Sequence, residues 1–286
     1  MKIVVQVEDR QLTLTNLDKL LYPDGFTKGQ VLDYYTRIAP VLLPHLAGRP
    51  LTLKRWPNGV QGHSFYEKNA PSHRPDWLRT ETLPSPGSTK QRETIQYAVV
   101  EELAALVWVA NLATLELHTP MWRVGSAPDL LVFDLDPGPG TSIVQCCEVA
   151  LLLRPLLEAE GLAPLAKTSG SKGLQVYART HVEDTSTYAK GLAQRLERDR
   201  PALVVHRMAK ALRPGRVLVD WSQNNPAKTT VCVYSLRARD RPTVSTPVTW
   251  DEVEKCSAAV DLVFTSDDVL ARVEAQGDLF APLVSS

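Results

Sequence analysis

The sequence has no long hydrophobic run, no internal repeat and no net charge. No segment approaches the roughly 18 consecutive apolar residues that a membrane-spanning helix needs, so we expect no membrane partner. Charge returns within the first eight positions, too early for a signal peptide, and this segment is typical of an edge strand. These absences make the cytoplasm the expected location.

Cysteine is also scarce, and its pattern does not match the usual metal or disulfide frameworks. None of the cysteines forms a Cys-x-x-Cys pair, and two are adjacent within an apolar segment. We therefore expect small core side chains, rather than zinc ligands or disulfide partners, at Cys146, Cys147, Cys232 and Cys256.

The zero net charge hides an uneven distribution along the chain. Residues 251–286 hold eight acidic and two basic side chains, so residues 1–250 hold 24 acidic and 30 basic ones. A basic main body permits a local phosphate-binding surface but does not establish one.

Hydrophobic periodicity and turn residues predict an α/β (α+β) fold whose sheets are covered by helices. Thr27 can cap a first helix, which Pro40 and Pro44 should interrupt or kink. A long apolar helix is expected over 99–115, and residues 84–92 have the composition of a loop. We expect further strands at 130–136, 165–168, 174–179, 217–221 and 229–236, and helices at 142–160, 186–199, 250–256 and 266–274.

Two aspartates stand at the end of the buried strand expected at 130–136. Side chains alternate along a strand, so Asp134 and Asp136 point to the same face beside the Gly/Pro loop that follows. They would repel each other unless a divalent cation took their oxygens as ligands. The alternative is two solvated acids at a strand end, and the Asp-x-Asp pattern alone does not decide between the two.

A third carboxylate, Asp220, lies in the strand expected at 217–221. A neighbouring strand could place it against Asp134 and Asp136. Three acids can hold two Mg²⁺ or Mn²⁺ ions about 3.5–4 Å apart for phosphoryl transfer. Taken alone, Asp220 would be a surface acid, but the set of three predicts a two-metal site.

A glycine-rich segment suited to phosphate follows between two expected strands. Residues 168–173 read Thr-Ser-Gly-Ser-Lys-Gly, which can form an anion nest with hydroxyls from Ser169 and Ser171 and a charge from Lys172. The segment lacks the spacing of a Walker A loop. A flexible hairpin turn remains the alternative.

Two further groups of basic residues could bind phosphates. The first, with Lys210 and Arg213, leads directly into Asp220, which favours a triphosphate clamp over a solvated surface. The second mixes basic and aromatic side chains, as nucleic-acid-binding surfaces do, although surface lysines and core aromatics are the alternative. It consists of Lys19, Lys28, Lys54, Arg55 and Lys68, with Trp56, Phe65 and Tyr66. His118, expected to end the apolar helix, has no metal-ligand partner at a useful spacing.

Several short motifs occur in one order along residues 10–250. They are Leu14-Thr-Asn-Leu-Asp-Lys19, Leu21-Tyr-Pro, Thr27-Lys-Gly, Gly48-Arg-Pro, Lys54-Arg-Trp-Pro-Asn-Gly59, Phe65-Tyr-Glu-Lys-Asn-Ala-Pro71, Phe133-Asp-Leu-Asp-Pro-Gly138, Thr168-Ser-Gly-Ser-Lys-Gly173 and Val219-Asp-Trp-Ser-Gln-Asn224. Together they resemble the polymerase domain of the bacterial end-joining ligase LigD. They are also similar to the stand-alone Prim-PolC-type enzymes of the archaeo-eukaryotic primase superfamily.

The resemblance implies a primase-like catalytic core with a mixed sheet, packed against an N-terminal α/β module. Three units are expected. Residues 1–115 form an N-terminal module that contacts DNA and the 5′-phosphate, and residues 116–250 form the catalytic core. Residues 251–286 form a helical tail that packs on that core. The implied activity is that of a DNA-directed DNA/RNA polymerase that uses two Mn²⁺ (or Mg²⁺) ions. It would add NTPs or dNTPs, usually ribonucleotides, during gap filling in non-homologous end joining or base excision repair.

The resemblance also implies partners and site residues. Gapped or broken duplex DNA with a 5′-phosphate, a DNA ligase and end-binding repair proteins are the implied partners, and we expect a nucleoid-associated monomer. By motif position, Asp134, Asp136 and Asp220 correspond to metal ligands. The implied nucleotide-binding residues are His118, Ser169, Lys172, Lys210, Arg213 and, at the edge, Gln223. The implied DNA-binding residues are Lys19 and Lys28 at the 5′-phosphate, Phe65 and Tyr66 stacking at the template, and Lys54, Arg55 and Lys68 nearby.

One departure and three competing functions remain at this point. Gln175 stands where the family commonly has histidine, so triphosphate binding or its pH dependence is expected to differ. A haloacid-dehalogenase-type phosphatase shares Asp-x-Asp but places Thr or Val where this chain has Gly138. A non-catalytic module that binds DNA ends or gaps would not need three acids, and a metal-dependent nuclease would not need a triphosphate clamp. We expect a free-standing enzyme rather than an excised domain.

Overall fold

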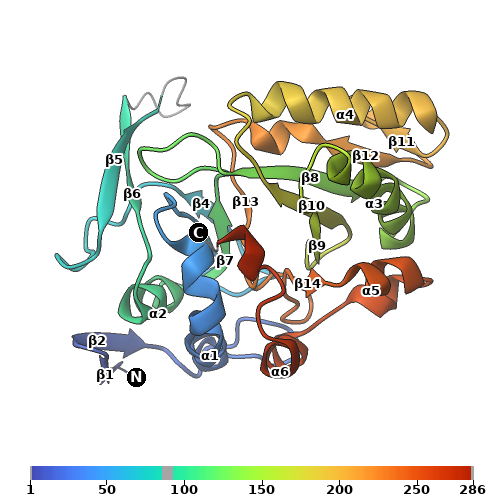
Figure 1. Ribbon diagram of the computed structural model, residues 1–286. Coiled ribbons are helices and arrows are strands. Elements are labelled where there is room, and N and C mark those ends of the chain that lie inside the picture. The colour runs from blue at the N-terminus through green and yellow to red at the C-terminus, as the bar shows by residue number, and fades with distance from the viewer. Residues whose placement is uncertain (1, 86–92, 285–286) are drawn as a thin grey trace.

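A mixed six-stranded sheet, an antiparallel four-stranded sheet, two two-stranded sheets and the helices packed on them form the described part of the protein (Figure 1). A computed structural model describes residues 2–85 and 93–284. Residues 86–92 of the expected loop therefore lie outside the described part of the chain. Among the described residues, no helix combines the length and the apolar character needed to cross a lipid bilayer.

The larger sheet has six strands in the order β11-β12-β8-β10-β9-β14. Its central strand pairs antiparallel with both neighbours, so the polar ends of three strands meet at one edge of the pocket. The strands are β8 (Leu130–Pro137), β9 (Leu165–Thr168), β10 (Leu174–Arg179), β11 (Val204–Val205), β12 (Val217–Asp220) and β14 (Pro247–Val248).

The two faces of β8 meet different surroundings. Leu131, Phe133 and Leu135 lie in the hydrophobic cluster under the helices, whereas Leu130 and Val132 lie in the cluster on the opposite face. Asp134 and Asp136 continue that second face, where the strand leaves the apolar core. The sequence alternation therefore places both carboxylates on one side of the sheet, as predicted.

Two long helices, α3 (Ile143–Glu158) and α4 (Thr185–Asp199), cover one face of this sheet (Figure 1). Ser142 caps α3 by accepting a hydrogen bond from the Val144 amide, as serine at this position commonly does. Cys146 and Cys147 are buried in the cluster between helix and sheet. All four cysteines are free; Cys146, Cys147 and Cys232 are buried, as predicted, whereas Cys256 is only partly buried and is not a core residue.

The smaller sheet has the order β13-β7-β3-β4, and the first two helices pack beside it. Thr27 caps α1 (Lys28–Leu46), as predicted, but the helix continues through Pro40 and Pro44 and is not interrupted. The remaining bounds are β1 (Lys2–Val7), β2 (Arg10–Thr15), β3 (Thr52–Arg55), β4 (Phe65–Glu67), β5 (Thr80–Pro84) and β6 (Thr94–Ala98).

The prediction of a long apolar helix over 99–115 is wrong. The structure has a short helix, α2 (Leu103–Asn111), a turn in which Ala113 has a φ of 59°, and then strand β7 (Thr114–Thr119). All six residues of β7 are buried, so the strand shows no alternation of exposed and buried residues that would distinguish it from the helix before it. His118 consequently lies within a strand rather than at a helix end.

The expected division at residue 115 falls inside β7, which pairs with β3 on one side and with β13 (Thr230–Val231) on the other. The strand predicted over 229–236 is reduced to β13, because the chain turns at Tyr234, whose φ is 64°. The C-terminal segment forms two short helices as predicted, α5 (Trp250–Lys255) and α6 (Ser266–Gln276).

Candidate active site

Three carboxylates meet at the centre of the six-stranded sheet. Asp134 and Asp136 come from β8, and Asp220 lies directly opposite Asp134 in the β8–β12 register. One oxygen from each of the three can be chosen so that all lie within 4.8 Å of one another. Directly opposed like charges destabilise a sheet, so this arrangement calls for a cation.

Burial and mutual repulsion change the protonation of these acids. Burial, and then the charges on Asp134 and Asp220, raises the pKa of Asp136 to about 7. Burial also raises the pKa of Asp134, although a hydrogen bond from Gln175 opposes it. A divalent cation would favour the ionised forms and remove the repulsion. The oxygen-only donor set fits Mn²⁺ or Mg²⁺.

Neighbouring residues fix the third carboxylate. Asp220 accepts hydrogen bonds from the Ser222 amide and hydroxyl on one oxygen and from the Gln223 side chain, 3.0 Å away, on the other. Lys228 in turn donates to the Ser222 hydroxyl. Gln223 and Lys228 thus lie at the edge of the acidic group.

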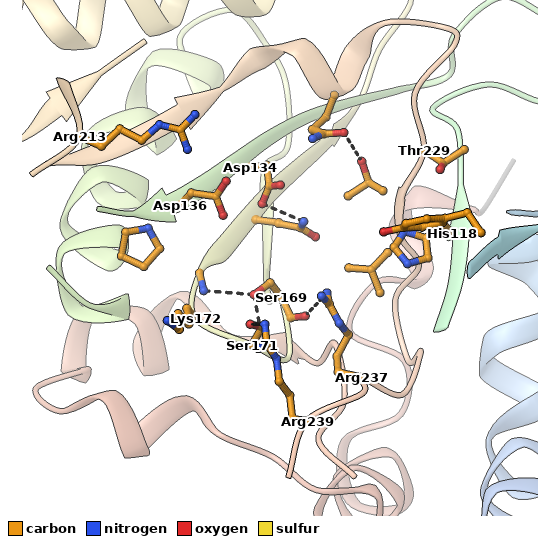
Figure 2. A pocket seen from close by; sticks show the side chains of 17 residues that line it. His118, Asp134, Asp136, Ser169, Ser171, Lys172, Arg213, Thr229, Arg237 and Arg239 are labelled. Atoms are coloured by element: carbon orange, nitrogen blue, oxygen red, sulfur yellow. Dashed lines mark hydrogen bonds between the residues drawn. The ribbon is translucent and has the colours of Figure 1, made fainter. Parts of the chain in front are cut away.

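A pocket of about 430 Å³ opens in front of the acids. Figure 2 shows Asp134 and Asp136 on one side of it and Ser169, Lys172, Arg237 and Arg239 on another. A triphosphate between the two sides would therefore meet metal-binding oxygens and cationic donors together. Of the predicted site residues, the pocket is lined by Tyr66, His118, Asp134, Asp136, Ser169, Lys172, Arg213 and Gln223.

The glycine-rich segment between β9 and β10 forms a tight loop at the floor of the pocket. The Ser169 hydroxyl accepts hydrogen bonds from the Ser171 and Gly173 amides. Gly170 has a φ of 66°, and a Cβ there would lie 2.6 Å from the Val244 backbone. Lys172 is exposed at the loop tip, free to reach an anion in the pocket.

Arg213 reaches the pocket because a glycine lets two loops approach. A Cβ at Gly138 would lie 2.0 Å from the Arg213 carbonyl oxygen, so no side chain fits there. The guanidinium of Arg213 lowers the pKa of Asp136, against the larger effect of burial. Lys210, on the 3₁₀ turn Lys210–Leu212, does not line this pocket. The crowding also opposes a phosphatase motif with Thr or Val at position 138.

Sequence analysis missed two arginines of the pocket, Arg237 and Arg239. Arg237 donates to Glu116, 3.1 Å away, and to the Ser169 carbonyl oxygen, 2.8 Å away. Arg239 donates to the Ser171 hydroxyl. Both lie on an irregular segment after β13, where no strand periodicity or motif marks them.

Buried Glu116 connects several cations around the pocket. It pairs with Arg237, with His118 at 2.9 Å and with Lys54 at 3.7 Å. Burial raises the pKa of Glu116, but these partners outweigh it and hold the pKa at about 2. Burial lowers the pKa of His118, so the histidine offers a neutral ring edge to the pocket at neutral pH.

The predicted template residues form a cation–aromatic layer on β3 and β4. The Lys54 ammonium lies 4.8 Å from the Trp56 ring centroid and 4.9 Å from that of Tyr66, and Arg55 lies over Phe65. Phe65 and Tyr66 are 37% and 55% exposed, so both rings are accessible to a base. Lys68, just beyond, donates to the Ala227 carbonyl oxygen.

Lys28 and Lys19 lie apart from this pocket, beside Arg55. The Lys28 ammonium is buried and donates to the Thr15 carbonyl and hydroxyl oxygens. Burial, then the charges of Lys19 and Arg55, lowers the pKa of Lys28 to about 8. The neighbouring charges of Lys19 and Arg55 are both positive, so an incoming anion would be favoured here.

A model of the LigD primase-polymerase domain family matches residues 27–280. The chain belongs to this family. The relatives named below are non-homologous end joining proteins. The chain is 45% identical over 282 residues to the multifunctional non-homologous end joining protein LigD of Mycolicibacterium smegmatis, covering 96% of this chain and 36% of that protein. It is 30% identical to the bifunctional LigD of Bacillus subtilis, covering 93% and 43%.

A solved structure of this LigD family confirms the expected α/β fold. The polymerase domain from Mycobacterium tuberculosis Ligase D, in complex with DNA, superposes with a TM-score of 0.90 and is 43% identical. The match covers 97% of this chain and 99% of that domain. The chain thus corresponds to one domain and spans well under half the length of the curated relatives named here.

The raised pKa of Asp136 predicts a pH-dependent response to metal. The folded state binds a proton on Asp136 between about pH 4 and its pKa of about 7, whereas the unfolded state does not. Without metal, the contribution of Asp136 to the free energy of unfolding therefore falls as the pH rises through that window. Since Mn²⁺ must displace the proton, MnCl₂ should raise Tm more at about pH 8 than at about pH 5.5.

Thermal denaturation with and without MnCl₂ at both pH values checks this expectation. In the Asp136→Asn protein, which has no proton to displace at this position, the Tm increase caused by MnCl₂ should differ less between the two pH values. Equal Tm increases at both pH values in the unaltered protein would contradict a protonated Asp136.

Proposed function

We propose that this chain is a template-directed nucleotidyltransferase that adds nucleotides at short gaps or ends of DNA during repair. The observation that carries the proposal is that Asp134 and Asp136, with Asp220 beside them, lie at a pocket lined by Lys172, Arg213 and other cations. A nuclease or phosphatase needs the acids but has no need for cations arranged to hold a triphosphate. The LigD family membership supports the same activity.

The residues divide the chemistry between them. The three aspartates would hold two divalent ions, which would favour loss of the proton from the primer 3′-hydroxyl and stabilise the negative charge on the leaving pyrophosphate. Ser169, Lys172 and Arg237 would bind the triphosphate oxygens and stabilise the charge that develops as pyrophosphate leaves. We also propose that the ion is Mn²⁺ and that ribonucleotides are the preferred substrate. Both follow from the resemblance.

DNA would approach over the cation–aromatic layer. Tyr66 lies between that layer and the pocket, with its ring 5.5 Å from the His118 ring. A templating base stacked on Tyr66 or Phe65 would thus be beside the nucleotide site. The M. tuberculosis domain was solved in complex with DNA, which supports DNA as a ligand of this chain. A ligase and end-binding proteins are further proposed partners, which follow from the resemblance.

The deciding experiment is primer extension on a short gapped duplex with MnCl₂. The protein should extend the primer by the templated nucleotide, and faster with NTPs than with dNTPs. Binding of the gap without any extension would favour a non-catalytic end-binding module. Equal use of NTPs and dNTPs would retain the polymerase but remove the ribonucleotide preference.

Lys28 provides a test of the 5′-phosphate site. Substituting Lys28→Met should reduce the preference for gaps with a downstream 5′-phosphate by about tenfold, since a charge-assisted hydrogen bond contributes about 1.5–3 kcal/mol. Binding to gaps with and without the phosphate, by fluorescence anisotropy, measures the preference. Lys255→Met removes a fully solvated lysine paired with Asp251 and should leave it unchanged. An unchanged preference in Lys28→Met would remove this residue from the site.

A further inference from the structure

Four polar residues form a row across four neighbouring strands behind the pocket. Asp220 is opposite Asp134, Asp134 is opposite Gln175, and Gln175 is opposite Lys167. Lys167 is 1% exposed and Gln175 is 2% exposed. The row therefore runs from the acids of the pocket to a lysine inside the protein, and the proposed chemistry does not use that lysine.

The Lys167 ammonium has a complete set of acceptors. It donates to the Gln175 side-chain oxygen, to the Ser245 hydroxyl at 2.6 Å and to the Val231 carbonyl oxygen at 3.2 Å. An ammonium has three protons to donate, and each has a partner here. Burying a cation is costly unless it is hydrogen-bonded, so this arrangement holds the lysine in one position.

The lysine also determines which way the Gln175 amide points. Lysine can only donate, so the amide must present its oxygen to Lys167 and its NH₂ group to the other side. On that other side, Nε2 donates to Asp134 Oδ1 at 2.9 Å. The orientation of a carboxylate in the acidic set therefore depends on a cation two strands away.

We propose that Lys167 is a positioning residue for the metal site, acting through Gln175 to orient the Asp134 carboxylate. This inference rests on the proposed function, because it concerns the ions that the three aspartates would bind. Its second contact, with Val231, fixes the pocket wall on β13 against the six-stranded sheet. Lys167 thus holds the metal side and the opposite wall of the pocket at a constant separation.

The test is direct Mn²⁺ binding to the full chain, measured from the EPR signal of free Mn²⁺ without DNA or nucleotide. Lys167→Met and Gln175→Met each break the chain of hydrogen bonds at one link while conserving side-chain length. Each should weaken Mn²⁺ binding about tenfold, since residues that orient metal ligands typically contribute this much. The double variant should bind no more weakly than the weaker single variant, because both substitutions interrupt one route.

Two controls separate positioning from general destabilisation. Arg49 is a buried cation, 1% exposed, that pairs with Asp129 at 2.7 Å and does not line the pocket of the acids. Arg49→Met should lower Tm yet leave the Mn²⁺ dissociation constant unchanged. Gln175→His retains one donor and one acceptor, so it should bind Mn²⁺ within about threefold of the unaltered protein. If Lys167→Met does not fold, Gln175→Met and Gln175→His decide the question.

Several outcomes would overturn the inference. Unchanged Mn²⁺ binding in Lys167→Met or in Gln175→Met would show that the row does not position Asp134. Additive losses in the double variant would show that Lys167 does not act through Gln175. The unaltered protein should bind Mn²⁺, and Asp134→Ala should lose that binding. If the two proteins bound Mn²⁺ equally, or neither bound it, the proposed metal site would be refuted, and the inference with it.

Discussion

The Asp134→Ala protein should extend a gapped primer at least about a thousandfold more slowly than the unaltered protein. Asp134 is the central acid of the set, opposite Asp220 in register and on the same face as Asp136. Removing it leaves two acids for two ions, and metal stabilisation contributes several kcal/mol, each 1.36 kcal/mol being about tenfold in rate. Single-turnover extension, with protein in excess over primer, measures the loss of extension rate without a contribution from product release.

DNA binding separates this result from unfolding. Asp134→Ala should bind the gapped duplex with an affinity close to that of the unaltered protein, because the template residues and the Lys28 site lie on other elements. Asp199→Ala removes an exposed acid at the end of α4 and should retain full extension. Extension by Asp134→Ala at the unaltered rate would refute the metal assignment.

The placement of Asp134 and Asp136 could be predicted from sequence because it depends on local rules. The period of two along a strand places Asp134 and Asp136 on one face, and the apolar residues before them bury the strand. Strands β9 and β10 have the predicted bounds, since Gly170 and Gly173 mark the turn between them. Joining Asp220 to this pair required the motif order and the resemblance, because pairing between distant strands is not a local property.

The segment around His118 shows where local rules are insufficient. Residues 99–119 are apolar for most of their length, and such a run is typical of either a buried helix or a buried strand. The change from α2 to β7 depends on pairing with β3 and β13, which are far away in the sequence. The histidine could therefore be selected by resemblance, but its position beside Tyr66 and Glu116 could not.

Arg237 was missed for a related reason. Its two partners, Ser169 and Glu116, are 68 and 121 residues away along the chain. It lies on an irregular segment whose route is set by the turn at Tyr234 and by bridges to other segments. A basic residue in such a segment is a surface residue by default, and only the folded chain shows that it faces the acids.

Arg237 should nevertheless be one of the most important residues for nucleotide use. We expect Arg237→Met to lower kcat/KM for the incoming nucleotide by about a hundredfold to a thousandfold, as loss of one donor to a developing charge typically does. The guanidinium donates to Ser169 and Glu116, so its position in the pocket is fixed before the nucleotide arrives. Steady-state extension over a range of nucleotide concentrations measures the change.

The comparison with Arg241→Met makes this test specific. Arg241 is an exposed arginine four positions later that does not line the pocket, so its loss should leave kcat/KM unchanged. Mn²⁺ binding should persist in Arg237→Met, because the three aspartates are untouched, and this distinguishes a triphosphate contact from loss of the metal site. If Arg237→Met retained kcat/KM within about threefold, the cation side of the pocket would have to bind triphosphate through Lys172, Arg213 and Arg239.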